Sequence, residues 1–145
     1  MPVSPVTDLA FSKNGDFIIE NGDLKDSTWE AWEGHRQMIR SRVLGIEGDW
    51  KLYPGISANL DQEIGKLNTR ERGANVVKRI LQALTFDGAY QTQNLKVKAV
   101  PVSKTAIVAV VILSVITVDN LYNEEVTELF TVTDTEMNPH LISTN

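Results

Sequence analysis

The chain has 145 residues and a net charge of −5, and it is 42% hydrophobic and 23% charged, which is typical of a single globular domain. It contains no cysteine and only two histidines, which excludes disulfide frameworks, iron–sulfur clusters, cysteine nucleophiles and zinc sites built from cysteine or clustered histidine. The first residues lack the basic start and apolar run of a signal peptide, and the apolar stretch at 106–116 is shorter than the ~20 residues that a membrane helix needs. We therefore expect no targeting or membrane segment, and synthesis in a reducing cytoplasm.

The charge is distributed unevenly along the chain. Residues 1–67 have a net charge of −4, residues 68–104 of +5 and residues 105–145 of −6, the last without any lysine or arginine. Either these parts neutralise one another within the fold, or the chain stacks on neighbouring subunits through oppositely charged faces. Because the basic cluster at 70–79 has no interleaved aromatic residue and the chain is acidic overall, a solvated helix face or a protein partner is favoured over nucleic acid.

The first third of the chain is predicted to contain an extended arm, a short strand and a helix. The arm covers 1–12, and the strand at 17–20 lies between two turn signals. A capping pair places the start of the helix near Thr28, and glycines end it from Gly45 onward. Its apolar face is indicated by side chains that recur at helical spacing, namely Trp29, Trp32, Arg36, Ile39 and Val43.

Two more helices are predicted after a connector at 48–55. The first covers about 56–67 and carries apolar residues four apart, namely Ile56, Leu60 and Ile64, followed by Leu67. The next begins with a capping pair at Asn68 and ends at Asp87 and Gly88. Its inward face is expected to hold Val77, Ile80, Leu81 and Leu84, and its opposite face Arg72, Asn75, Arg79 and Gln82.

The remainder of the chain is predicted to be β-structure. Alternation at 94–99 indicates a strand with one wet face, whereas the Val/Ile-rich run at 106–118 is typical of a central strand covered on both sides. A turn at 119–124 leads to a third strand at 126–132 and a polar tail at 133–145. The prediction is an α+β fold in which three N-terminal helices precede a small antiparallel β-meander, in a single domain spanning 1–145.

No catalytic signature is present. There is no glycine-rich phosphate loop, paired-histidine helix or serine elbow, and Glu30 and Glu33 lie in the first turns of a helix, where carboxylates are favoured whatever the function. We interpret His35 as a histidine at the edge of the core. The sequence therefore predicts no catalytic, metal or cofactor site, and a protein that is not an enzyme.

Several short motifs occur in a characteristic order between Gly22 and the Val-rich strand. They are Gly22-Asp23-Leu24, a helix with Gln37 at its centre, Gly48-Asp49, Tyr53-Pro54-Gly55, Gln82-Ala83-Leu84 and Leu95-Lys96-Val97. Together they resemble the baseplate wedge or sheath-initiator family of contractile phage tails and related injection machines, some members of which are labelled lysozyme-like. The similarity spans about 22–118. It divides the chain into the arm at 1–12, a family-like core at 13–118, and an extra strand and tail at 119–145.

The resemblance implies a structural subunit of the virion. Such a protein is assembled in the host cytoplasm, joins the tail baseplate to the tail and templates the first sheath ring. Its implied partners are other wedge subunits, the first ring of sheath subunits and the tail tube, with no cofactor, nucleic acid or membrane. Many members carry a Glu-Pro-Arg triplet after the Ala-Leu helix, where this chain has Phe86-Asp87-Gly88-Ala89. The contact with neighbouring wedge subunits that the triplet makes is therefore expected to be weaker or moved.

Protein contacts are predicted at nine positions, which are Tyr53, Pro54, Gly55, Arg72, Arg79, Asp87, Glu128, Phe130 and Val132. The last three lie on a strand predicted at the sheet edge, where Glu124, Glu125 and Glu128 favour a basic partner strand. One alternative is an unrelated cytosolic protein-binding adaptor that uses this acidic edge for strand addition. Another is a peptidoglycan-cleaving enzyme, which only the older family label suggests.

Overall fold

The computed structural model describes residues 9–12, 16–26, 33–116 and 123–140. The helices and strands are β1 (Ile19–Glu20), β2 (Asp23–Leu24), α1 (Glu33–Val43), α2 (Arg70–Thr85), β3 (Leu95–Pro101), β4 (Ile107–Ile116), β5 (Asn123–Val132) and β6 (Met137–His140). Short 3-10 turns are η2 (Pro54–Ile56), η3 (Leu60–Glu63), η4 (Phe86–Gly88) and η5 (Thr92–Asn94). None of the helices in these ranges is both long and apolar enough to cross a membrane.

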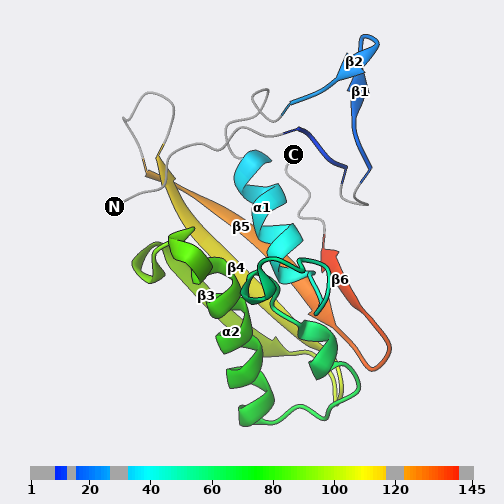
Figure 1. The fold of residues 1–145 in the computed structure, drawn as a ribbon. Helices are drawn as coiled ribbons and strands as arrows, with labels where there is room; N and C mark the ends of the chain where they lie inside the picture. Colours follow the sequence, from blue (N-terminus) through cyan, green and yellow to red (C-terminus); the bar gives the residue numbers. More distant parts are fainter. Residues whose placement is uncertain (1–8, 13–15, 27–32, 117–122, 141–145) are drawn as a thin grey trace.

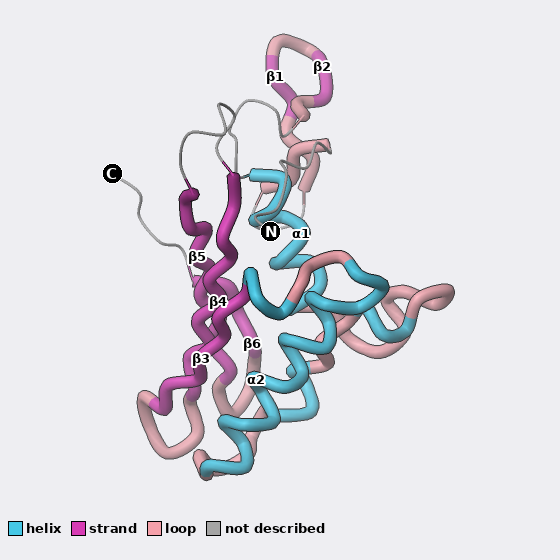
Figure 2. Tube along the Cα trace, turned by 90° about the vertical axis from the view of Figure 1, so that its left-hand side faces the viewer, coloured by secondary structure: helices cyan, strands magenta, loops and turns pink. Residues whose placement is uncertain are grey.

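A four-stranded antiparallel sheet in the order β3-β4-β5-β6 forms the centre of the molecule, and α1 and α2 lie against one of its faces (Figures 1 and 2). Its register aligns Ala99, Ala109, Phe130 and Pro139 across the four strands. A separate two-stranded hairpin, β1–β2, projects beyond α1 (Figure 1). The molecule therefore has two layers, helices on sheet.

The core lies between the helices and the sheet. Side chains alternate along a strand, so every second residue of β4 faces α1 and α2. The fully buried contributors come from all the main elements and include Ile39, Val43, Val76, Ile80, Leu84, Ile107, Val111, Leu113 and Phe130. Val108, Val110 and Ile112 lie on the opposite face and are only partly buried. Among the described residues no helix or strand covers that face, so the predicted coverage of this strand on both sides is not found there.

The predicted fold of three N-terminal helices and a small meander is wrong. The described chain has two helices and six strands in two antiparallel sheets, and the helices lie in the middle of the sequence. The error lies first in 56–67, which forms the short turns η2 and η3 rather than a helix. Asn59 and Gly65 adopt φ of 55° and 81°, which a helix cannot include. The backbone N–H groups of Ala58 and Gly65 bond instead to the carbonyls of Arg42 and Thr133.

The second source of error is the β-structure at the two ends of the described chain. Asn21 and Gly22, with φ of 54° and 80°, turn the predicted strand at 17–20 back on itself as the β1–β2 hairpin. Within the predicted polar tail, Thr133 accepts a hydrogen bond from the Glu136 N–H and closes a tight turn. That turn brings β6 against Leu129–Val132 of β5.

Helix α2 forms where the sequence predicts its third helix, but its cap is Thr69 and not the predicted Asn68, whose side-chain amide donates to the carbonyls of Ser103 and Ala106. The Thr69 hydroxyl accepts a hydrogen bond from the Arg72 N–H at 3.1 Å. Helix α1 ends at Val43, before Gly45 as predicted, while Trp29, Trp32 and the helix start near Thr28 lie outside the described residues. Most of the arm at 1–12 and of the turn at 119–124 also lies outside them.

Candidate protein interface

Four of the nine predicted contact residues are buried inside the chain. Arg72, Glu128, Phe130 and Val132 expose almost none of their surface. Tyr53, Pro54 and Asp87 are exposed, and Gly55 and Arg79 are partly exposed. The structure therefore does not bring the nine residues together on one surface. The exposed candidates lie at the start of η2, namely Tyr53 and Pro54, and in η4, namely Asp87.

The predicted basic stripe of Arg72 and Arg79 is occupied by contacts within the chain. Arg72 donates hydrogen bonds to the carbonyl oxygens of Glu63 and Thr105 at 2.8 and 2.6 Å. Arg79 binds the Glu63 carboxylate at 3.2 Å. Burial lowers the pKa of Arg72, and the nearby charge of Glu63 partly offsets this, but a guanidinium remains charged at neutral pH. These arginines connect α2 to η3 and to the β3–β4 turn.

Glu128 is held between β5 and α1. Its carboxylate accepts hydrogen bonds from Arg36 at 3.1 Å and Arg40 at 3.0 Å. Over Leu129–Val132, β5 lies between β4 and β6, so this part of it is not a sheet edge, contrary to the prediction. Glu125 is exposed, whereas the side chain of Glu124 lies outside the described part of the chain. The predicted acidic edge for strand addition therefore lacks Glu128.

The connector, in which the sequence predicts a turn and a contact at Tyr53, forms a loop with further apolar side chains exposed at Trp50 and Leu52. This Ile46–Tyr53 loop exposes Leu52 by 85%, Tyr53 by 52% and Trp50 by 44%. Its backbone is closed by its own hydrogen bonds, from the Ile46 N–H to the Asp49 carboxylate at 3.0 Å and from the Tyr53 N–H to the Trp50 carbonyl at 3.0 Å. The available signal was three large apolar residues, 50, 52 and 53, inside a segment bounded by glycine and proline.

Gly55 and Asp87 have specific backbone roles on either side of Phe86. A Cβ on Gly55 would lie 2.3 Å from the Phe86 ring, so glycine allows this close approach. Asp87 and Gly88 have φ of 58° and 71°, a conformation that proline cannot adopt. The end of α2 is therefore incompatible with a proline at Asp87, which is consistent with the absence of the Glu-Pro-Arg triplet.

Replacement of Gly55 by alanine is expected to lower the free energy of unfolding by about 1–3 kcal/mol, because the new methyl group must displace the Phe86 ring. Gly73→Ala is the matched control. Its Cβ would lie 4.0 Å from that of Ala99, an ordinary contact, and alanine inside α2 is expected to stabilise the protein by about 0.5–1 kcal/mol. Urea denaturation of both variants measures the difference. An unchanged stability of Gly55→Ala would contradict the close packing.

Gln37, the central glutamine of the resemblance, attaches the N-terminal segment to α1. Its side-chain amide donates to the Leu9 carbonyl at 2.9 Å, and its carbonyl oxygen accepts from the Phe11 N–H. An antiparallel bridge between Phe11 and Phe17 then joins this segment to the chain that leads into β1. The glutamine therefore positions the segment that carries the hairpin.

A buried polar pair lies beneath α1. The Tyr90 hydroxyl lies 2.9 Å from Nδ1 of His35 and donates to the Met38 sulfur at 3.3 Å. Both His35 and Tyr90 are buried, so His35, predicted to lie at the edge of the core, is completely enclosed. Burial raises the pKa of Tyr90 well above its usual range, and the nearby charge of Arg42 lowers it slightly.

Tyr90 is expected to make the protein sensitive to alkali. An unfolded tyrosine ionises near pH 10 but the folded one stays protonated, so its stabilisation is present below about pH 10 and is lost as the pH rises further. Tyr90→Phe should cost about 1 kcal/mol at neutral pH, through the lost hydrogen bond, and should flatten the loss of stability above about pH 10. Urea denaturation across that range measures both effects. Identical alkaline slopes for the two proteins would refute the role of Tyr90.

Among the residues that the structure describes, no three or more histidine, aspartate or glutamate side chains are grouped so as to hold a metal ion. Comparisons of the chain with family models, curated proteins and solved structures find no match.

Proposed function

We propose that this chain is a non-enzymatic structural subunit, a baseplate wedge or sheath initiator of a contractile injection machine. The observation that carries the proposal is the Ile46–Tyr53 loop, which presents Trp50, Leu52 and Tyr53 to solvent on a backbone closed by its own hydrogen bonds. Large apolar side chains that are exposed together are typical of protein-binding surfaces. Because the loop is held in shape before binding, little ordering entropy opposes association.

The anchoring of the loop supports this role. At its start, Gly45 packs against Ser57 and accepts a hydrogen bond from the Asn59 N–H at 3.1 Å. Arg42, just before it, donates to the carbonyls of Ala83 and Phe86 at the end of α2. A force on the loop is therefore transmitted to α1 and α2 rather than to a free connector, as a subunit that joins two parts of a machine requires.

The motifs of the resemblance also have roles that suit an assembly protein. The Gly22 turn forms the projecting β1–β2 hairpin (Figure 1). Ile19 and Leu24 on the hairpin, and Phe17 just before it, are exposed. This hairpin and the Ile46–Tyr53 loop offer two apolar surfaces, and a wedge subunit needs several neighbours. The proposed partners are other wedge subunits and the first sheath ring.

The test is complementation in the particle that carries this chain. Deletion of its gene is expected to give tails without assembled sheath in electron micrographs, and the unaltered gene should restore them. Leu52→Asp should fail to restore sheath, since it places a charge where the loop meets its neighbour. Normal sheath after deletion, or full rescue by Leu52→Asp, would disprove the proposed function.

Leu67→Asp is the matched control, because Leu67 is also largely exposed but lies outside the loop. It should restore sheath as well as the unaltered gene does. Both variants must first show unchanged cooperative melting, so that a failure of assembly is not a failure to fold. The peptidoglycan-cleaving alternative is tested in parallel by assaying the purified protein for release of reducing ends from cell walls, which we expect to be absent.

A further inference from the structure

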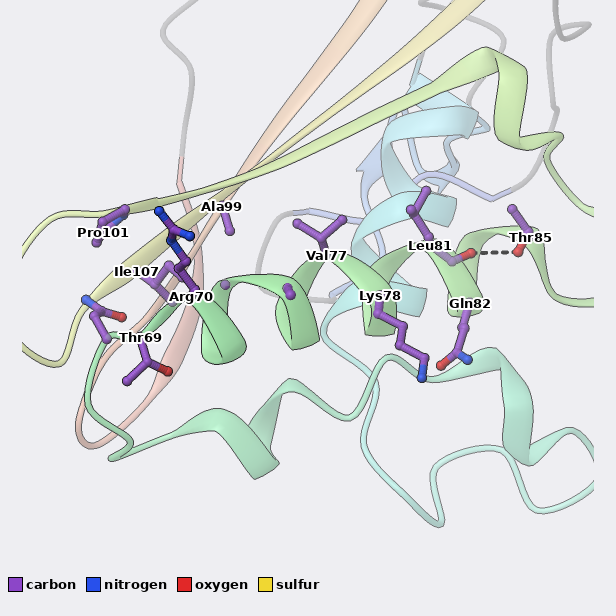
Figure 3. Close-up of a pocket in the computed structure, with 13 residues that line it drawn as sticks. Thr69, Arg70, Val77, Lys78, Leu81, Gln82, Thr85, Ala99, Pro101 and Ile107 are labelled. Carbon is purple, nitrogen blue, oxygen red and sulfur yellow. Dashed lines mark hydrogen bonds between the residues drawn. The ribbon is translucent and has the colours of Figure 1, made fainter.

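A groove of about 850 Å³ runs between α2 and β3 (Figure 3). Figure 3 shows Val77 and Leu81 pointing from α2 toward β3, where Ala99 points back at them, and the Thr85 hydroxyl donates to the Leu81 carbonyl at its far end. Most of its lining is apolar. Gly73 also lines the groove, and because it has no side chain, the helix does not narrow the groove at this position. The groove therefore has an apolar floor bounded by a helix and a strand.

The strand beside the groove has an available edge. Within the described ranges β3 pairs with β4 alone, so every second backbone N–H and C=O group of β3 has no strand partner. Pro101 lacks a backbone N–H, so the edge that can form hydrogen bonds is the part of β3 that precedes it. An extended peptide laid here would complete the backbone hydrogen bonds of β3 while its side chains enter the groove.

The alternation of β3 specifies the side chains of such a peptide. Val97 and Ala99 are partly buried and pack against the core, whereas Lys96 and Lys98 are exposed on the opposite face. Residues directly opposite each other in neighbouring strands share a face and interact, so an added strand would place apolar residues beside Val97 and Ala99 and acidic ones beside the lysines. Lys96 and Glu125 form a largely exposed ion pair with a long N–O distance of 3.9 Å. A peptide carboxylate can replace Glu125 as the partner of Lys96.

The positive charge at the groove is uncompensated. Five of the six arginines donate hydrogen bonds to carboxylates or carbonyls within the chain, and only Arg70, at the groove, makes no such contact among the described residues. Lys78, at the groove, and Lys98 likewise have no ion-pair partner there. Lys51 and Lys104, which lie outside the groove, also lack an ion-pair partner among the described residues, so the contrast rests on the arginines. Arg70 is the one described arginine without a partner inside the described chain, and its position at the groove favours an acidic partner molecule.

We propose that the groove between α2 and β3 binds an extended segment of a partner protein, in which acidic and apolar residues alternate, as a fifth strand on β3. The apolar residues enter the groove over Val77 and Leu81, and the acidic residues face Lys96 and Lys98, with Arg70 at one end. This site is distinct from the Ile46–Tyr53 loop.

The probe is an eight-residue peptide of alternating glutamate and valine, capped at both ends. Titration into the full chain is expected to shift backbone amide NMR signals of β3 and α2, with saturable binding that weakens as NaCl rises from about 0.05 to about 0.5 M. A lysine–valine peptide should not bind. Shifts confined to other elements, or equal binding of the two peptides, would overturn the proposal.

Variants separate this site from a general charge effect. Arg70→Glu and Lys98→Glu should each weaken binding about fivefold or more, because each replaces an attraction by a repulsion. Lys51→Glu makes the same charge change at an exposed lysine away from the groove and should leave the affinity unchanged. Ala74→Phe, at an exposed groove position, should block binding without altering the core. Equal losses in Lys51→Glu, or full affinity in Ala74→Phe, would disprove strand addition here.

Leu52→Asp distinguishes the groove proposal from the proposed role of the Ile46–Tyr53 loop. It should bind the peptide with unchanged affinity, because the Ile46–Tyr53 loop does not line the groove. Loss of sheath in that variant with retained peptide binding would support both proposals independently. Failure of the peptide to bind the unaltered chain would remove the groove proposal and leave the role of the loop untouched.

Discussion

Glu128→Ala is expected to lower the free energy of unfolding by about 3 kcal/mol. The substitution leaves Arg36 and Arg40 without the carboxylate that both of them bind, and each arginine side chain is only 19% exposed. Removing one partner of a buried ion cluster costs about 3–5 kcal/mol, and the partial exposure of the arginines places the effect at the lower end. Urea denaturation with a constant denaturant slope measures it.

Glu125→Ala is the control for Glu128→Ala. Both residues lie on β5, but the Glu125 carboxylate is exposed, and its ion pair with Lys96 is long, at 3.9 Å. Exposed pairs contribute little, so this variant should stay within about 0.5 kcal/mol of the unaltered protein. Equal stabilities of the Glu128 and Glu125 variants would show that Glu128 does not hold α1 against the sheet.

Phe130→Ala is expected to cost about 3–5 kcal/mol, through lost burial and the cavity that remains. The Phe130 ring is completely buried, opposite Ala109 on β4, and this small neighbour cannot fill the space. Differential scanning calorimetry or urea denaturation measures the loss. Phe17→Ala is the control, because that ring is largely exposed and contacts Phe11 at a centroid distance of 4.8 Å. Its cost should be about 1 kcal/mol or less. A small effect at Phe130 would mean that its ring faces a partner, as the sequence analysis predicted.

These two variants concern residues whose burial the sequence analysis did not recognise. Glu128 and Phe130 were both predicted to contact a partner because their strand was expected to be the sheet edge. The edge assignment failed because β6, a strand of four residues containing a proline, has a weak local pattern that could not be distinguished from a polar tail. Glu128 lies outside the pairing of β6 with Leu129–Val132, and its burial follows instead from its contacts with Arg36 and Arg40 of α1.

The sequence alone determined those elements in which the hydrophobic periodicity and the residues at the ends indicate the same secondary structure. Helix α2 has a threonine cap and an apolar stripe, and β3 alternates lysine with apolar residues, so each is specified by residues close together in the chain. The large apolar residues of the Ile46–Tyr53 loop were also visible in its composition, although their exposure could only be seen in the structure.

Only the tertiary structure decided the rest. Residues 56–67 have helical spacing, yet their backbone groups bond to Arg42 and Thr133, far away in the sequence, and these contacts outweigh a weak local preference. The arginines of α2 looked alike in the sequence, but Arg72 binds the backbone carbonyl of Glu63 and Arg79 binds its carboxylate. Arg70 is left at the groove. Whether a charge is neutralised inside the chain depends on which segments pack together. Local sequence determines the elements, whereas long-range packing decides which of their side chains remain available to a partner.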